Sequence, residues 1–221
     1  MQYAALRFDI VKSRRLKQRA SVQKSFLMSA EDINREFADV LEASFVVTHG
    51  DEAQALLRVS NIQSVFPILE HLTVSVDGVN FRCGVGLGTL NTSLQEMAIG
   101  MDGEAWQNAK QAINEAKVKR QSIRFEGFDP QLQPHLNAIG NLLCYLCSRW
   151  TKEQRETIRL FSKASTQTEI AAQLGISNAA VSKRLTAAGW QHYLQGRKTL
   201  EFLLEQAAKQ AEEHLVNGTF H

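Results

Sequence analysis

The sequence lacks long apolar stretches and contains little cysteine. No apolar run in its 221 residues approaches the roughly 18 that a membrane-spanning helix needs, so we expect no membrane span. Near the start of the chain, Arg7 and Asp9 interrupt the apolar stretch that a signal peptide requires. The three cysteines form an odd set without the spacing of a disulfide framework, which favours a reducing compartment. We therefore expect a cytoplasmic protein.

The cysteines also lack the neighbours that a zinc site would need. Cys144 and Cys147 stand three residues apart in an apolar segment, and no second cysteine or histidine pair lies nearby in the sequence. A structural zinc ion takes about four such ligands. We therefore interpret both thiols as residues of the hydrophobic core.

The net charge is small, but it is unevenly distributed along the chain. The formal net charge is +2, whereas residues 149–198 alone carry 9 basic and 3 acidic side chains. The segments on either side are neutral to acidic. A basic block in this setting indicates a polyanionic partner, although a solvated helix surface would give the same count.

Hydrophobic periodicity predicts a mixed first part of the chain. Strands are expected at 3–11, 43–48, 53–59, 79–87 and 122–127, and helices at 21–41, 62–72 and about 103–117. The resulting order β-α-β-β-α-β-α-β begins with the arrangement of ferredoxin-like and palm domains. We therefore expect an α+β fold with a ferredoxin-like or palm N-terminal domain over residues 1–128.

The remainder of the chain, from 132 to 221, is predicted to form an all-α domain. Asp129-Pro130 and Gln133-Pro134 mark the linker. Helices are expected at about 132–149, 152–163, 166–189 (a helix-turn-helix) and 198–216. The final helix has an apolar face that would be buried against a second copy of the chain or against the first domain. Together with the two-fold symmetry of paired DNA sites, this face predicts a homodimer.

Residues 166–189 have the pattern of a helix-turn-helix. Thr166 and Glu169 have the spacing of a capping box that begins a helix. Gly175 suits the sharp turn, and Ser177 suits the cap of the next helix. The inward positions are Ile170, Ala171, Leu174, Val181, Leu185 and Ala188. The segment resembles the helix-turn-helix of sigma-factor region four and of one-domain repressors.

The predicted DNA contacts are short polar or cationic side chains that fit the major groove. They are Thr166, Gln167, Ser177, Asn178, Ala179, Ser182, Lys183 and Arg184. The expected partner is double-stranded DNA, which the local positive charge would attract. An ordinary helical hairpin that contacts another protein is the alternative interpretation.

A second group of residues points to a nucleotide. Asp9 ends the first predicted strand and Asp51 lies in the turn between the next two, where a palm domain gathers carboxylates that hold Mg²⁺ with a bound nucleotide. Lys12, Arg14 and Arg15 follow Asp9 and are predicted to bind the phosphates. A solvated loop or a second DNA-facing patch would explain the same basic residues.

Short motifs support this interpretation by resemblance. Gly-Asp-Glu at 50–52 resembles the core of diguanylate cyclases, and Phe-Asp-Ile at 8–10 resembles the first metal motif of class III nucleotide cyclases. The segment 82–88 resembles a following strand of those enzymes. Where those cyclases carry an Asn and an Arg, this chain has Gln107 and Gln111, which weakens the case for turnover. We assign no catalytic residue.

Taken whole, the sequence resembles the SatD family. The resemblance runs through Gly-Asp-Glu-Ala-Gln-Ala-Leu-Leu at 50–57, Ile-Gly-Met-Asp-Gly at 99–103, Arg-Trp-Thr-Lys-Glu-Gln-Arg at 149–155 and Val-Ser-Lys-Arg-Leu at 181–185. The leading hypothesis is a DNA-binding transcriptional regulator whose palm-like domain senses a Mg-nucleotide or mediates dimerisation. The alternatives are a nucleotide cyclase or nucleotidyltransferase-like enzyme attached to a DNA-binding domain, and a purely structural dimerisation domain.

Overall fold

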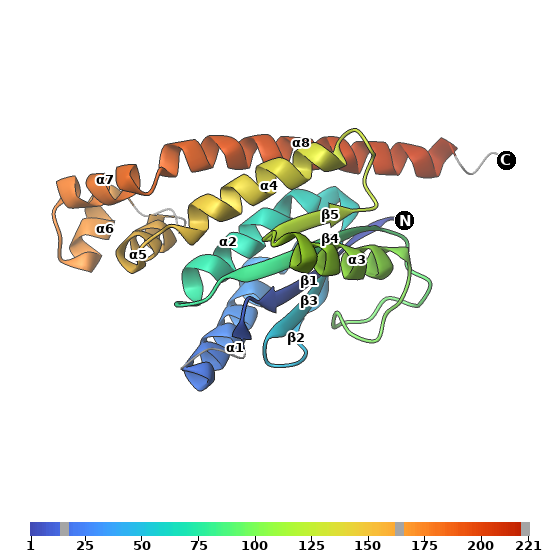
Figure 1. The fold of residues 1–221 in the computed structure, drawn as a ribbon, viewed down its shortest axis with the longest axis horizontal. Helices are drawn as coiled ribbons and strands as arrows, with labels where there is room; N and C mark the ends of the chain where they lie inside the picture. Colours follow the sequence, from blue (N-terminus) through green and yellow to red (C-terminus); the bar gives the residue numbers. More distant parts are fainter. Residues whose placement is uncertain (14–17, 162–165, 218–221) are drawn as a thin grey trace.

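A five-stranded sheet forms the centre of the first part of the chain in the computed structural model, which describes residues 1–13, 18–161 and 166–217, with side chains up to residue 213 (Figure 1). Its strands are β1 (Tyr3–Ile10), β2 (Leu41–Val47), β3 (Glu52–Arg58), β4 (Phe81–Gly88) and β5 (Ile123–Glu126). Their spatial order is β2-β3-β1-β4-β5. The β4–β5 pair is parallel and the other pairs are antiparallel.

Helices cover both faces of the sheet. Helices α1 (Arg19–Glu36) and α2 (Val65–Ser75), with the short 3₁₀ helix η2 (Val59–Ser64) before α2, pack on one face, and α3 (Glu104–Lys119) packs on the other. Side chains alternate along β1, so that Leu6 and Phe8 enter the main core while Ala5 lies under α3. The predicted α+β class and the element order of the first part are confirmed.

Helix α3 approaches β4 closely because β4 has glycine at alternate positions. A Cβ atom on Gly86 would lie 2.0 Å from the Ala109 nitrogen and 2.2 Å from the Ala105 carbonyl oxygen. A side chain at this position would therefore collide with the α3 backbone. The glycines of β4 set the distance between this helix and the sheet.

Helix α4 (Gln133–Ser148) covers the outer edge of β5. The Asn137 side chain accepts a hydrogen bond from the Phe125 N–H at 2.9 Å and donates to the Phe125 carbonyl at 3.3 Å. The Asn141 side chain donates to the Ile123 carbonyl at 2.7 Å. Two amides thus occupy backbone groups that an edge strand would otherwise leave unpaired.

The chain continues with α5 (Lys152–Phe161), α6 (Gln167–Leu174), α7 (Asn178–Ala187) and the long α8 (Trp190–Asn217) (Figure 1). The prediction that the last helix begins at residue 198 is wrong, because α8 already begins at Trp190. Gly196 does not break the helix: it lies where α8 crosses α4, and a Cβ there would be 2.9 Å from a methyl of Leu143. In the described residues no helix is long and apolar enough to cross a membrane.

The apolar face of α8 is buried within the same chain. Leu200 and Leu204 are fully buried in the core that also contains the main face of the sheet. Helix α8 packs against α4 and η2, so this face no longer argues for a dimer. The homodimer and the division into domains 1–128 and 132–221 stay predictions.

Candidate functional site

The acidic residues predicted to bind metal lie at one end of the central strands. The Ile10 N–H donates a hydrogen bond to the Asp51 carbonyl oxygen at 2.9 Å. Asp9 is the last but one residue of β1, and Asp51 directly precedes β3. The hydrogen bond therefore places Asp9 next to the turn that carries Asp51. Neighbouring antiparallel strands bring the two segments together, although 41 residues lie between them in the sequence.

Asp9 is buried and is held by two cations. Its Oδ1 accepts a hydrogen bond from Arg82 Nη1 at 3.0 Å, and its Oδ2 lies 2.8 Å from Lys117 Nζ. Arg82 lies opposite Asp9 on β4, and Lys117 is in the last turn of α3. A buried carboxylate needs such partners because its desolvation is costly. The two cations together exceed its charge, so the site is locally positive.

The strand register decides which side chains share a sheet face with Asp9. Asp9 lies opposite Glu52 in the register of β1 and β3. The Glu52 carboxylate forms an ion pair with Arg7, with Oε2 4.0 Å from Nη2. A small cavity of about 110 Å³ opens on this α3 side of the sheet. Its charged lining is Arg7, Glu52, Lys110 and Lys117.

Asp51 has a different partner. Its carboxylate accepts a hydrogen bond from the hydroxyl of Ser13, a buried residue of the segment that follows β1. Asp9 and Asp51 therefore lie near each other in the backbone but bond to separate groups. In the part of the chain that the structure describes, no three His, Cys, Asp or Glu side chains gather as a metal site.

Of the residues predicted to bind phosphate, Lys12 is exposed just beyond β1, while Arg14 and Arg15 lie outside the described residues. Gln107 and Gln111 lie exposed on α3, and the Gln111 amide donates to Glu115 at 3.2 Å. Hydrogen bonds from Lys119 and Gln111 lower the pKa of Glu115. Gln111 is thus engaged with a neighbour on its own helix.

Sequence reasoning missed three members of this site: Ser13, Arg82 and Lys117. Arg82 was part of a quoted motif, but nothing local in the sequence pairs it with a residue 73 positions away. The pairing depends on the register between β1 and β4. Opposite charges on two predicted strands are the only signal that could have suggested it.

Helices α6 and α7 are joined by a short capped turn. The Thr166 side chain accepts a hydrogen bond from the Glu169 N–H, and the Glu169 carboxylate accepts one from the Thr166 N–H, which completes the capping box. Gly175 ends α6 with a φ of 63°. Ser177 caps α7 by accepting a hydrogen bond from the Ala180 N–H. These local features agree with the pattern in the sequence.

Most of the residues predicted to contact DNA are exposed. Exposed are Thr166, Gln167, Ser177, Asn178, Ala179, Ser182 and Lys183. Arg184 differs, because its guanidinium turns toward α5 and donates to the Thr157 hydroxyl at 3.3 Å. Its position therefore supports the packing of α7 on α5.

Comparisons with solved structures give weak likenesses. A bacterial light-regulated adenylyl cyclase aligns with 56% of this chain and 74% of its own, at a TM-score of 0.42 and 10% identity. The guanylyl cyclase domain of the RhoGC fusion protein from the aquatic fungus Blastocladiella emersonii aligns with 51% of this chain and 74% of its own, at a TM-score of 0.40 and 12% identity. Likenesses at this level transfer neither fold nor function to this chain.

A search of curated protein sequences found no match. The model of the SatD family, in contrast, matches residues 3–204, which includes both the sheet and the helices that follow it. The chain belongs to the SatD family.

Proposed function

We propose that this protein binds a nucleotide, together with a divalent cation, at the end of β1 and β3. The observation that carries the proposal is the hydrogen bond between the backbones of Ile10 and Asp51, at 2.9 Å. It brings Asp9 and Asp51 to the same end of the two central strands. Lys12 and Ser13 follow directly in the chain.

The donor chemistry fits Mg²⁺. This ion prefers oxygen ligands and is commonly held by one or two carboxylates plus substrate phosphates. Asp9 and Asp51 would supply the carboxylates, and bound Mg²⁺ would neutralise phosphate charge. Because Asp9 is paired with Arg82 and Lys117, the cation would require an exchange of partners.

That exchange gives the surrounding cations a role. Once Asp9 faces a metal ion, the Arg82 guanidinium and the Lys117 ammonium would turn to phosphate oxygens, which they bind well. Arg7 and Lys110 line the neighbouring cavity and add positive charge. The chain would then orient the phosphates and compensate their charge.

The test is the thermal stability of the protein with Mg²⁺ or Mn²⁺ and ATP, GTP or a cyclic dinucleotide. A ligand present at about a hundred times its Kd should raise Tm by about 5–10 °C, because it binds only the folded state. Asp51→Asn should abolish the shift while leaving the unliganded Tm near that of wild type, since an asparagine oxygen can still accept the Ser13 hydrogen bond.

Asp39→Asn is the matched control. Asp39 is exposed at the opposite end of β2 from the Asp51 turn, so its variant should keep the full shift. If no metal and nucleotide combination raises the Tm of wild type, or if Asp51→Asn and Asp39→Asn respond alike, the proposed site is wrong.

Nucleotide cyclisation is the catalytic form of the same proposal. It is favoured by the two carboxylates at one end of the strands and opposed by Gln107 and Gln111 in place of charge-stabilising groups. Chromatography of the nucleotides after incubation of the protein with Mn²⁺ and ATP or GTP distinguishes cyclisation from binding alone. Cyclic nucleotide with pyrophosphate would make the protein an enzyme, and unchanged nucleotide would make it a binding protein.

A second function, binding of duplex DNA by α6 and α7, is also proposed. It is supported by the capped turn and by the exposed polar face that Asn178, Ser182 and Lys183 share. Such side chains suit the major groove. Arg184 is expected to contribute less to the contact, since one of its guanidinium nitrogens bonds to Thr157.

Fluorescence anisotropy with labelled duplexes at several salt concentrations tests DNA binding. Lys183→Ala should weaken binding to all sequences and reduce the salt slope by about 1, whereas Asn178→Ala should change sequence preference. Lys209→Ala, which removes an exposed cation from α8, is the control and should change little. Wild-type affinity in Lys183→Ala would show that α7 does not contact the phosphates.

A further inference from the structure

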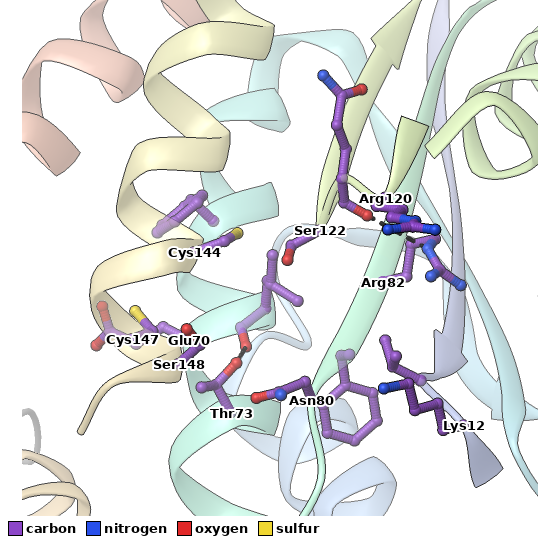
Figure 2. A pocket seen from close by; sticks show the side chains of 15 residues that line it. Lys12, Glu70, Thr73, Asn80, Arg82, Arg120, Ser122, Cys144, Cys147 and Ser148 are labelled. Carbon is purple, nitrogen blue, oxygen red and sulfur yellow. Dashed lines mark hydrogen bonds between the residues drawn. The ribbon is translucent and has the colours of Figure 1, made fainter. Parts of the chain in front are cut away.

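A cavity of about 560 Å³ opens between α2, α4 and the beginning of β4 (Figure 2). It lies on the main-core side of the sheet, whereas the Asp9 carboxylate faces α3. Its volume falls within the range of small-molecule sites, about 300–1,000 Å³. Lys12 and Arg82 line it and also belong to the region described above; its other lining residues do not.

The two sides of the cavity differ in chemistry. One side is apolar and consists of Phe66 and Leu69 of α2 and Cys144 and Cys147 of α4. Three cations, Lys12, Arg82 and Arg120, lie on the sheet side in Figure 2, across the cavity from the cysteines of α4. Glu70 also lines the cavity and carries a negative charge. This charge is compensated by Arg197, whose Nη1 lies 3.0 Å from the carboxylate, and the carboxylate also accepts a hydrogen bond from the Tyr193 hydroxyl. Arg82 is paired with Asp9, so the uncompensated positive charge of the lining comes from Lys12 and Arg120.

Two residues with an unusual backbone conformation also line this cavity. Lys12 and Arg120 are the two non-glycine residues with positive φ among those the structure describes, at 59° and 56°. Both line this cavity, and both are cations whose side chains bond to no other described residue. Residues other than glycine rarely adopt this backbone conformation. Arg120 adopts it as the C-cap of α3, where glycine is the usual residue. Such residues gather at functional sites.

We propose that the cavity binds an amphipathic organic anion. Its apolar body would lie against Phe66, Leu69 and Cys144, and its carboxylate or phosphate would pair with Arg120 and Lys12. Asn80 and Ser122 supply further polar groups beside these cations. The site needs no metal ion and goes beyond the nucleotide site proposed at Asp9 and Asp51.

The probe is 1-anilinonaphthalene-8-sulfonate, an aromatic anion whose fluorescence rises in apolar surroundings. We expect saturable binding of one dye per chain. Arg120→Asn removes the charge with a residue type that tolerates positive φ, and Cys144→Leu narrows the apolar side. Each should weaken dye binding at least fivefold. The neutral analogue N-phenyl-1-naphthylamine should bind at least fivefold more weakly than the anion and should not respond to Arg120→Asn.

Two controls keep the outcomes separate. Lys24→Asn removes an exposed cation of α1 that does not line the cavity, and Asp51→Asn disables only the proposed nucleotide site; both should bind the dye like wild type. Displacement of the dye by indole-3-acetate would indicate a ligand with a carboxylate. Displacement by adenosine monophosphate in Asp51→Asn, in which the proposed nucleotide site is disabled, would indicate a ligand with a phosphate. Wild-type dye affinity in both Arg120→Asn and Cys144→Leu, or displacement by neither competitor, would overturn the proposal.

Discussion

Cys83, Cys144 and Cys147 are buried thiols, and for Cys144 and Cys147 this confirms the prediction from their apolar sequence context. Burial raises the pKa of each above its usual value, because the thiolate would lose its hydration. The thiols of the unfolded chain titrate at their ordinary pKa, near 8.5. The folded and unfolded states therefore differ in the protonation of these three thiols only as the pH approaches and exceeds that value.

This difference predicts that the protein loses stability in mild alkali. Above about pH 8.5 the unfolded chain releases thiol protons that the folded chain retains, so unfolding becomes more favourable as pH rises. Each thiol contributes up to about 1.4 kcal/mol per pH unit. Urea denaturation from pH 7.5 to 10 in the presence of a reductant measures the slope.

Cys144→Ser removes one of the three thiols and should reduce that slope by about a third. A slope equal to that of wild type would mean that Cys144 ionises as readily in the folded protein as in the unfolded chain, and is not buried as the structure has it.

At the scale of elements, the packing of α3 on β4 depends on glycine. We expect Gly86→Ala to destabilise the protein by about 3 kcal/mol, at the upper end of overpacking costs, because the new methyl meets backbone atoms of Ala105 and Ala109. The free energy of unfolding measured by urea denaturation tests this expectation.

Gly196→Ala is the matched substitution in a helix. Its methyl would meet only the end of the Leu143 side chain, which can shift, and alanine gains about 1 kcal/mol of helix propensity over glycine. The variant should remain within about 1 kcal/mol of wild type. Equal losses in Gly86→Ala and Gly196→Ala would contradict the close approach of α3 to β4.

At the scale of the whole molecule, one hydrophobic core joins the sheet to the helices that follow it. Leu136 of α4 and Tyr193 and Leu200 of α8 belong to the same buried cluster as Phe8 and Phe66. The Arg155 guanidinium adds a hydrogen bond of 2.8 Å to the Thr73 carbonyl. Contacts of this kind couple the unfolding of the two parts.

We therefore expect a single cooperative unfolding transition. In a Trp106→Phe variant, tryptophan fluorescence reports on Trp150 and Trp190 in the helical part. Urea denaturation of this variant followed by fluorescence should coincide with denaturation followed by far-ultraviolet circular dichroism. Two separated transitions would instead favour independent domains at 1–128 and 132–221.

The sequence by itself determined the local structure. The strand and helix order of the first part follows from periodicity, because each element shows its buried face within a few residues. The caps at Thr166 and Ser177 could be predicted because a cap bonds residues two or three positions away. Buried thiols could likewise be expected from their apolar neighbours.

Only the tertiary structure decided contacts between distant segments. The pairing of Asp9 with Arg82 depends on the register of β1 against β4, which periodicity leaves open. The last helix was expected to begin at residue 198, yet α8 begins at Trp190 and runs through Gly196, against which Leu143 of α4 packs. The apolar face of α8 could have been covered by a second copy; instead η2 and α4 cover it. In each case the partner is chosen by how whole elements pack, which no short stretch of sequence specifies.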